Sequence, residues 1–202
     1  MNSRRRMQLY RTMHSWHWIS AAICLAALLL FCITGITLNH ASAITTTPRV
    51  IRKEAQLPPS LQLLLAGEHP QATLPDPLAD WIEDQFDIDT DTASVEWSPE
   101  ELYVSAPGPG RDAWVMIDRA SHMATSESTD RGWLAYFNDL HKGRNTGLVW
   151  TIFIDVVAAA CVFFSLTGLV LLWIQARQRT TTWPLVSLGV GVLVALMILF
   201  AH

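Results

Sequence analysis

Three long apolar runs constrain what this chain can fold into. Residues 19–38 contain no charged side chain, residues 148–174 contain only Asp155, and residues 183–201 contain none. A helix needs roughly 20 residues to cross a hydrocarbon core about 30 Å thick. A soluble fold rarely needs three such runs. The sequence therefore predicts an α-helical integral membrane protein with three transmembrane helices in a lipid bilayer.

The basic residues of the short segments predict the orientation of these helices. The segment before the first run and the loop between the second and third runs contain arginines and no acid: Arg4, Arg5, Arg6, Arg11, Arg177 and Arg179. Lys and Arg gather in short cytoplasmic loops of membrane proteins. We therefore expect a cytoplasmic N-terminus and an extracytoplasmic segment between the first two helices.

The segment between the first two runs is strongly acidic. It holds 8 of the 14 Lys and Arg and 17 of the 18 Asp and Glu, so its formal charge is −9 although that of the whole chain is −4. A surface of this sign can attract cationic partners or metal ions and repels the phosphates of nucleic acids. We expect no binding of nucleic acid.

The acidic segment also carries signals for a small α+β domain. Residues 74–88 and 132–143 have helical spacing, and Asp76 is the expected cap of the first of these helices. Between them, residues 94–106 alternate like two strands and residues 112–127 like a hairpin. The sequence therefore predicts a small mixed domain between the first two membrane helices.

The expected layout follows from these elements. Residues 45–60 read as an extended linker with short strand potential. The predicted segments are a basic cytoplasmic N-terminus (1–13), a first transmembrane helix (14–39), a periplasmic domain (40–147), a second helix (148–174), a cytoplasmic loop (175–182) and a third helix (183–202).

Two histidines lie where predicted membrane helices meet the outer side. His40 ends the first helix and His141 precedes the second. Packed helices lie about 8–10 Å apart, and a modest splay would let both imidazoles ligate the iron of one b-type haem. Lys142 and Arg144 could then meet the propionates. The alternative is that both histidines are interfacial residues, placed like Trp and Tyr at the headgroup level.

His14 and His17 lie at the cytoplasmic start of the first helix, where their i, i+3 spacing puts them on one face. They could bind a metal ion or a second haem, but the facing ends of the other helices offer no His, Met or Cys. A second haem would then need both axial ligands from this helix, or one of them from another protomer. His17 and His40 are about 34 Å apart at helical rise, so one haem cannot serve both. The alternative is that His14 and His17 bind no ligand and simply belong to the polar first turns of the membrane helix.

Asp155 is the only Asp, Glu, Lys or Arg inside the three apolar runs. An ionisable residue in a membrane is costly unless it is paired, and it often marks a function. Thr34 and Thr37 lie at similar depth in the first helix and are its expected hydrogen-bond partners. Asp155 could orient a ligand, carry a proton or lock two helices together, and we favour the lock.

Two stretches carry a family resemblance: "MHSWHWISAAICLAALLLFCITGITLNH" at 13–40 and "LHKGRNTGLVWTIFIDVVAAACVFFSLTGLVLLW" at 140–173. With the module around residues 74–128, they resemble the PepSY-associated transmembrane helix proteins of bacterial inner membranes, in particular the short three-helix members. Longer relatives include inner-membrane reductases of siderophore iron, in which histidines at helix ends hold haems.

The resemblance implies an inner-membrane protein with a PepSY-like periplasmic domain. It also implies that His40 and His141 are haem ligands, with His14 or His17 as the candidates on the inner side. The chain departs from the longer relatives because it has only three helices, whereas additional helices complete a second haem in those proteins. A homodimer or a partner membrane subunit would therefore have to complete the inner half.

These features favour electron transfer through haem b at the periplasmic face, with a ferric chelate or a periplasmic redox protein as the partner. The sequence contains no nucleophile–base constellation, phosphate loop or zinc motif, so hydrolase and transferase functions have no residues to carry them. Two alternatives stay open. One is a tethered PepSY module that binds or regulates a periplasmic protein without redox chemistry, and the other is an iron or copper site made of His40, His141 and His202.

Overall fold

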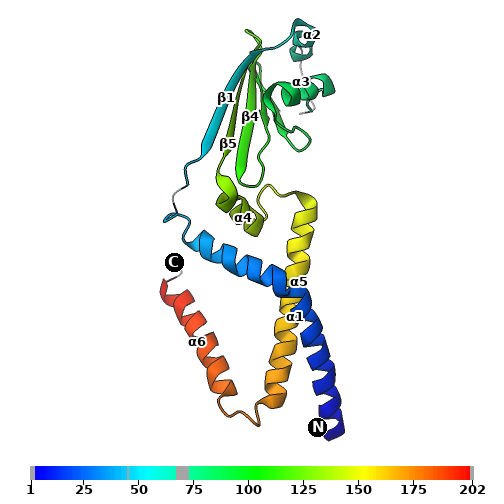
Figure 1. Cartoon of the computed structure of the whole chain (residues 1–202), viewed down its shortest axis with the longest axis vertical. Helices are drawn as coiled ribbons and strands as arrows, with labels where there is room; N and C mark the ends of the chain where they lie inside the picture. The colour runs from blue at the N-terminus through cyan, green and yellow to red at the C-terminus, as the bar shows by residue number, and fades with distance from the viewer. Residues whose placement is uncertain (1–2, 45, 67–72, 201–202) are drawn as a thin grey trace. The chain divides into compact units, whose positions relative to one another are not determined.

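The computed structural model describes residues 3–44, 46–66 and 73–200. The chain divides into two compact units. The helical unit consists of Met1–Leu30 and Phe153–His202, and the sheet unit is Phe31–Ile152. Figure 1 shows the elements of each unit in chain order.

Among the residues that the structure describes, three helices are long and apolar enough to cross a membrane. They are α1 (Ser3–Asn39), α5 (Gly147–Gln175) and α6 (Thr182–Phe200). Helix α1 begins well before the expected start at residue 14. Its first turns contain no Pro or Gly and are rich in Arg, Met, Gln and Leu, which are good helix formers. The basic N-terminus is therefore helical, and the three predicted apolar helices are confirmed.

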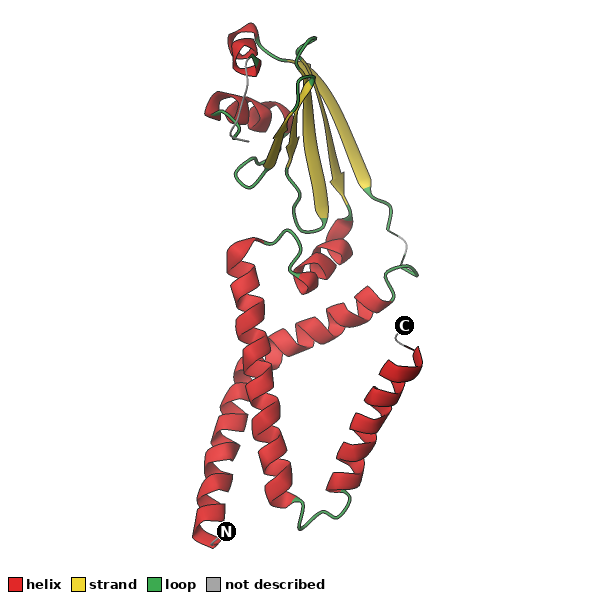
Figure 2. Cartoon of the chain, turned by 180° about the vertical axis from the view of Figure 1, so that it is seen from behind, coloured by secondary structure: helices red, strands yellow, loops and turns green. Residues whose placement is uncertain are grey.

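The sheet unit is built on a five-stranded antiparallel sheet in the order β1-β5-β4-β3-β2, drawn in yellow in Figure 2. The strands are β1 (Arg49–Gln56), β2 (Ser94–Trp97), β3 (Glu101–Ser105), β4 (Arg111–Asp118) and β5 (Met123–Asp130). The two strand predictions and the hairpin are confirmed. The expected linker contains β1, which pairs along its whole length with β5 at one edge of the sheet.

The tight turn of the β4–β5 hairpin depends on one carboxylate. Asp118 accepts hydrogen bonds from the backbone N–H groups of Ala120 and Ser121 and from the Ser121 hydroxyl. These bonds, those from Ser121 first, lower the pKa of Asp118 below its ordinary value. A charged side chain therefore holds the turn. His122, at the end of the turn, has a positive φ of 58°.

Helix α3 (Asp76–Phe86) covers one face of the sheet, as Figure 1 shows. Its residues Leu78, Ile82 and Phe86, four apart, are all buried in the core. They pack with inward-facing strand residues, among them Leu102, Val104, Val115 and Ile117. The predicted helix is confirmed, but the expected cap is wrong. Pro75 holds the N-cap position, and Asp76 is the first helical residue. A short helix α2 (Pro59–Gln62) and a 3-10 helix η1 (Leu63–Leu65) precede α3.

Helix α4 (Gly132–Lys142) follows β5 directly and leads to α5. It confirms the helical spacing predicted for residues 132–143. Gly143 ends it in a left-handed conformation with φ 64°, a backbone region that suits glycine. The indole N–H of Trp150, in the first turns of α5, donates to the Leu140 carbonyl and closes the corner between the two helices.

Candidate functional site

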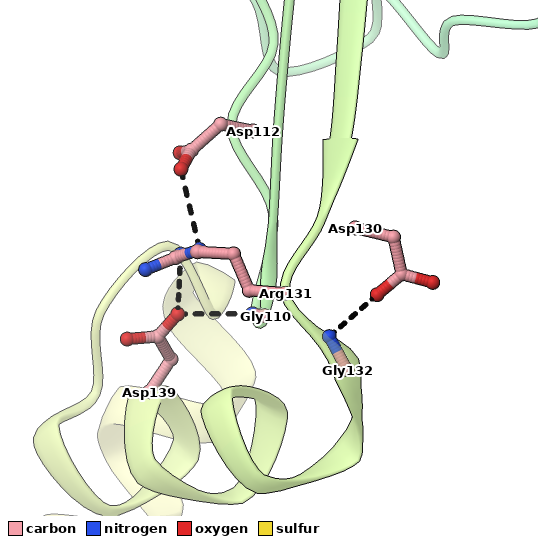
Figure 3. Close-up of polar contacts among 6 residues, drawn as sticks. All are labelled: Gly110, Asp112, Asp130, Arg131, Gly132 and Asp139. Carbon is pink, nitrogen blue, oxygen red and sulfur yellow. Dashed lines mark hydrogen bonds and ion pairs between the residues drawn. The ribbon is translucent and has the colours of Figure 1, made fainter. Parts of the chain in front are cut away.

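Helix α4 is anchored to the sheet by a nearly buried carboxylate. Asp139 accepts a hydrogen bond from the backbone N–H of Gly110 at 2.9 Å and from the Arg131 guanidinium at 2.8 Å (Figure 3). The Arg131 Nε also lies 3.3 Å from Asp112. Gly110, with φ 68°, sits so close to α4 that an added Cβ would lie 2.7 Å from the Tyr136 backbone nitrogen. These contacts fix α4 against the β3–β4 turn.

The opposite side of α4 binds the last turns of α1 through two polar side chains. The Thr37 hydroxyl donates to the Asn138 side-chain oxygen at 2.7 Å. One turn further along α4, the His141 Nδ1 lies 2.6 Å from the Thr34 hydroxyl oxygen. Asn138 and His141 are three residues apart, so they share one face of α4. This face positions His141 against α1.

His141 rests in a small recess of α1 that we call the His141 cradle, formed by Phe31, Thr34 and Gly35. The rings of Phe31 and His141 meet edge to face with centroids 5.1 Å apart. An added Cβ at Gly35 would lie 3.6 Å from the His141 Cε1, an ordinary contact distance, so the imidazole lies directly against the helix at this glycine.

The hydrogen bonds of Thr34 assign the tautomer of His141. The Thr34 hydroxyl donates to the Phe31 carbonyl at 3.3 Å. A hydroxyl has one proton, so when that proton is used in this bond the oxygen, 2.6 Å away, accepts the proton of His141 Nδ1, and we infer this tautomer. Nε2 then carries a lone pair. Within the residues that the structure describes, no hydrogen bond to this nitrogen is seen, which is the state of an imidazole able to ligate a metal.

His17 occupies a second recess of the same kind, the His17 cradle, formed by Phe164, Thr167 and Gly168 of α5. Its Nδ1 lies 3.1 Å from both the Phe164 carbonyl oxygen and the Thr167 hydroxyl oxygen. The imidazole stacks on the Phe164 ring with centroids 4.4 Å apart. A carbonyl oxygen only accepts hydrogen bonds, so Nδ1 must carry the proton and Nε2 the lone pair.

The two cradles have the same sequence pattern. Residues 31–35 read Phe-Cys-Ile-Thr-Gly and residues 164–168 read Phe-Ser-Leu-Thr-Gly. In each, the threonine hydroxyl donates to the phenylalanine carbonyl three residues before it. Sequence reasoning did not assign Thr167 and Gly168 to a site. The signal that could have found them is this repeat, placed once in each of two apolar runs that follow a histidine.

An apolar cavity of about 510 Å³ opens beside His17. Its walls come from α1, α5 and α6, and they include His17, Phe164, Gly168, Leu169, Leu172 and Val186. Cofactor-sized ligands occupy cavities of roughly 300–1,000 Å³ lined mainly by apolar side chains. The cavity therefore gives His17 the surroundings of a ligand to a large flat cofactor.

The structure places the other predicted histidines differently. His40 is exposed, and its Nδ1 lies 3.0 Å from the Ile36 carbonyl of the preceding turn. His40 lies five residues after Gly35, which is about 140° around the helix. It lies nine residues after Phe31, which is about 180° around the helix. Its ring thus lies away from the His141 cradle. His14 is exposed and contacts Tyr10, with ring centroids 5.9 Å apart. His202 lies outside the described residues.

Lys142 and Arg144 directly follow His141 at the end of α4. Both are exposed. Across residues 3–44, 46–66 and 73–200, neither side chain makes a hydrogen bond or ion pair. They are therefore available to an anionic group near His141, as the sequence predicts.

Thr34 and Thr37 were the expected hydrogen-bond partners of Asp155. In the structure their hydroxyl groups bond to side chains of α4 instead, as described above. Asp155 itself is exposed on α5, and its side chain makes no hydrogen bond or ion pair with the described residues of the helical unit. The expected lock between Asp155 and the threonines stays a prediction.

A PepSY_TM-like family model matches residues 8–202. The chain belongs to this family. The match confirms the resemblance of the two histidine-bearing stretches, and it covers all three apolar helices and the antiparallel sheet domain between the first two. Neither the curated proteins nor the solved structures contain a match to the chain.

Proposed function

We propose that this PepSY_TM-like protein binds haem b through His17 and His141 and transfers electrons in a bacterial inner membrane. The observation that carries the proposal is the hydrogen bond at Nδ1 of both imidazoles, which leaves Nε2 for a metal. Metal-ligating histidines almost always have such a second contact, because it fixes their tautomer and ring orientation.

The surrounding residues fit this cofactor. The cavity beside His17 is apolar and large enough for a cofactor. A bound haem b would supply one-electron chemistry at its iron. Thr34, together with the Phe164 carbonyl and Thr167, would hold the Nδ1 proton of each ligand, and the cationic Lys142 and Arg144 would meet propionates beside His141.

Bis-histidine ligation requires a second imidazole for each iron. His40, the partner expected from the sequence, points away from the His141 cradle by helical geometry. His14 is the candidate for the second imidazole ligand beside His17. We therefore propose that a second copy of the chain, or a partner membrane subunit, supplies the missing ligands. In a homodimer, the proposal requires that His40 of one copy reaches the His141 cradle of the other.

The proposed orientation has the sheet unit in the periplasm and the arginine-rich ends in the cytoplasm, because of the positive-inside rule. In this orientation the His141 cradle lies at the periplasmic side. The proposed electron acceptor is a ferric chelate, such as a ferric siderophore, or a periplasmic redox protein.

Reoxidation of the reduced protein tests this function. The detergent-purified wild type, reduced with a stoichiometric amount of dithionite, is mixed with ferric citrate while the reduced α-band is followed. We expect the band to disappear on mixing. A band that persists with an excess of ferric citrate would rule out ferric chelates as acceptors.

A second candidate function is a tethered module that binds a periplasmic protein without redox chemistry. A pocket of about 450 Å³ in the sheet unit favours it, with Arg49, Arg111, Trp133 and Tyr136 among its lining residues. The two guanidinium groups are exposed and form no ion pair with other described residues, so they could receive carboxylates of a partner. Purified protein without any Soret band would favour this function.

A further inference from the structure

A second large cavity of the helical unit lies where α1 begins and α5 ends. Its volume is about 550 Å³, and its lining residues are Arg6, Trp173, Ile174, Ala176, Arg177 and Trp183. It therefore combines side chains from α1, the last turn of α5, the following loop and the first turn of α6. Nothing in the proposed haem function uses these residues.

The two arginines of this cavity differ in how they are held. The Arg6 guanidinium donates to the Ile174 carbonyl in the last turn of α5. This bond satisfies a carbonyl that the helix leaves without an intrahelical partner, and it offsets the partial negative charge of the helix end. Arg177 is exposed, and no described residue accepts a hydrogen bond from its side chain. Arg6 is thus fixed in the wall, and Arg177 is free to close on a ligand.

The charge around the cavity has one sign. Within the helical unit the sequence contains a single acid, Asp155, against the arginines Arg4, Arg5, Arg6, Arg11, Arg177 and Arg179. Asp155 lies five turns of α5 or more before Ile174 and is no part of the cavity lining. An anion in the cavity therefore meets two guanidinium groups without a competing carboxylate.

The aromatic lining indicates the kind of anion. Trp173 and Trp183 are both exposed, at the end of one apolar helix and the start of the next. Indole rings at such helix ends lie at the headgroup level of a bilayer, where the N–H group donates to polar atoms and the ring contacts acyl chains. Guanidinium groups bind phosphate oxygens with paired hydrogen bonds. Basic pockets between membrane helices bind anionic headgroups in this way.

We propose that this cavity is a binding site for a phosphate group, with the headgroup of an anionic phospholipid as the ligand. Arg6 and Arg177 bind the phosphate oxygens, and Trp173 and Trp183 flank the glycerol and the first methylene groups. The bound lipid joins the ends of all three membrane helices, because the lining residues come from α1, α5 and α6.

Lipid retention measured by native mass spectrometry tests the site. The full chain, solubilised in a neutral detergent, is mixed with phosphatidylglycerol or phosphatidylcholine. The variants are Arg177→Gln, which removes a cavity guanidinium, and Arg5→Gln, which removes an equal charge from an exposed position of α1 outside the cavity. We expect about fivefold weaker retention of phosphatidylglycerol in Arg177→Gln and no change in Arg5→Gln.

Two results would overturn the proposal. One is equal retention of the two lipids by the wild type, and the other is an equal loss of phosphatidylglycerol in both variants, which would mean general attraction by the basic end. Inorganic phosphate distinguishes the source of the ligand. If it competes with phosphatidylglycerol at millimolar concentration, the cavity binds phosphate as such; if it does not, the acyl chains are required. Because the Arg177 side chain makes no hydrogen bond or ion pair with the described residues, we expect its substitution to leave the fold intact, and circular dichroism checks this independently.

Discussion

At the scale of single residues, the decisive feature is a proton on Nδ1 of two imidazoles. In the His17 cradle the Phe164 carbonyl requires this tautomer, and in the His141 cradle the Thr34 hydroxyl accepts the proton. Histidines at helix ends could be singled out as candidate ligands from the sequence, and their ligation stays a prediction. Their supporting oxygens could not be singled out in this way, because which threonine faces an imidazole depends on how helices pack.

Removal of the supporting hydroxyl should weaken haem binding more strongly at His141 than at His17. Thr34→Val removes the one acceptor that the described residues offer to His141 Nδ1, whereas Thr167→Val leaves the Phe164 carbonyl in place. We expect a loss of about tenfold in haem affinity for Thr34→Val and a smaller one for Thr167→Val, measured by haem titration. Thr151→Val is the control, since this hydroxyl bonds only to the Gly147 carbonyl of its own helix among the described residues. Wild-type affinity in Thr34→Val would contradict the assigned tautomer.

The two cradle glycines should differ in their tolerance of a methyl group. An added Cβ at Gly168 would lie 3.1 Å from the His17 Cε1, closer than ordinary contact, whereas at Gly35 it would lie 3.6 Å from the His141 Cε1. Gly168→Ala should therefore tilt His17 and shift the reduced α-band, measured in a His141→Ala background. Gly35→Ala, measured in a His17→Ala background, should keep the wild-type band. If the reduced α-band shifted in Gly35→Ala but not in Gly168→Ala, the result would contradict this geometry.

At the scale of elements, α4 joins the sheet to the end of α1. Asp139 bonds to the β3–β4 turn and to Arg131, and Asn138 and His141 bond to α1. The helical spacing of α4 was predictable because its apolar residues recur with the period of a helix. Its role was not, because the polar residues between them bind partners far away in the sequence.

The strand β1 illustrates the same limit in the sheet. Its residues Arg49–Gln56 alternate poorly and are mostly exposed, so the sequence predicted little more than an extended linker. Pairing with β5 along eight residues makes it a strand. Edge strands of this kind are defined by backbone hydrogen bonds, which leave no pattern in the side chains.

Loss of the buried ion pair at α4 should destabilise the protein. Asp139 is 5% exposed, and Asp139→Asn leaves the Arg131 guanidinium with only the partly exposed Asp112, 3.3 Å from its Nε, as a charged partner. We expect a loss of about 1–3 kcal/mol in the free energy of unfolding, measured by denaturation of the detergent-solubilised chain. Glu127→Gln is the matched control, because its partner Arg52 is 75% exposed and the pair should contribute below about 1 kcal/mol. Equal effects of the two substitutions would mean that Asp139 is no anchor.

At the scale of the whole molecule, each of the two compact units contains one imidazole held by a Phe-x-[Ile/Leu]-Thr-Gly stretch. The three apolar helices and the mixed domain between the first two were predictable from composition and periodicity. The repeat was visible in the sequence too, but its meaning depends on the contacts of His17 and His141. The pairing of His40 with His141 stays a prediction, because spacing along a helix says which end a residue occupies, not which side it faces.

The most direct test of haem ligation by His17 and His141 is the reduced-minus-oxidised absorption spectrum of the purified protein. It is recorded for the wild type, His17→Ala, His141→Ala and the double variant, all expressed with haem supplied. We expect a sharp α-band in the wild type, a weaker band in each single variant and none in the double variant. A wild type without a Soret band, or a double variant with the wild-type spectrum, would contradict the assignment of His17 and His141 as haem ligands.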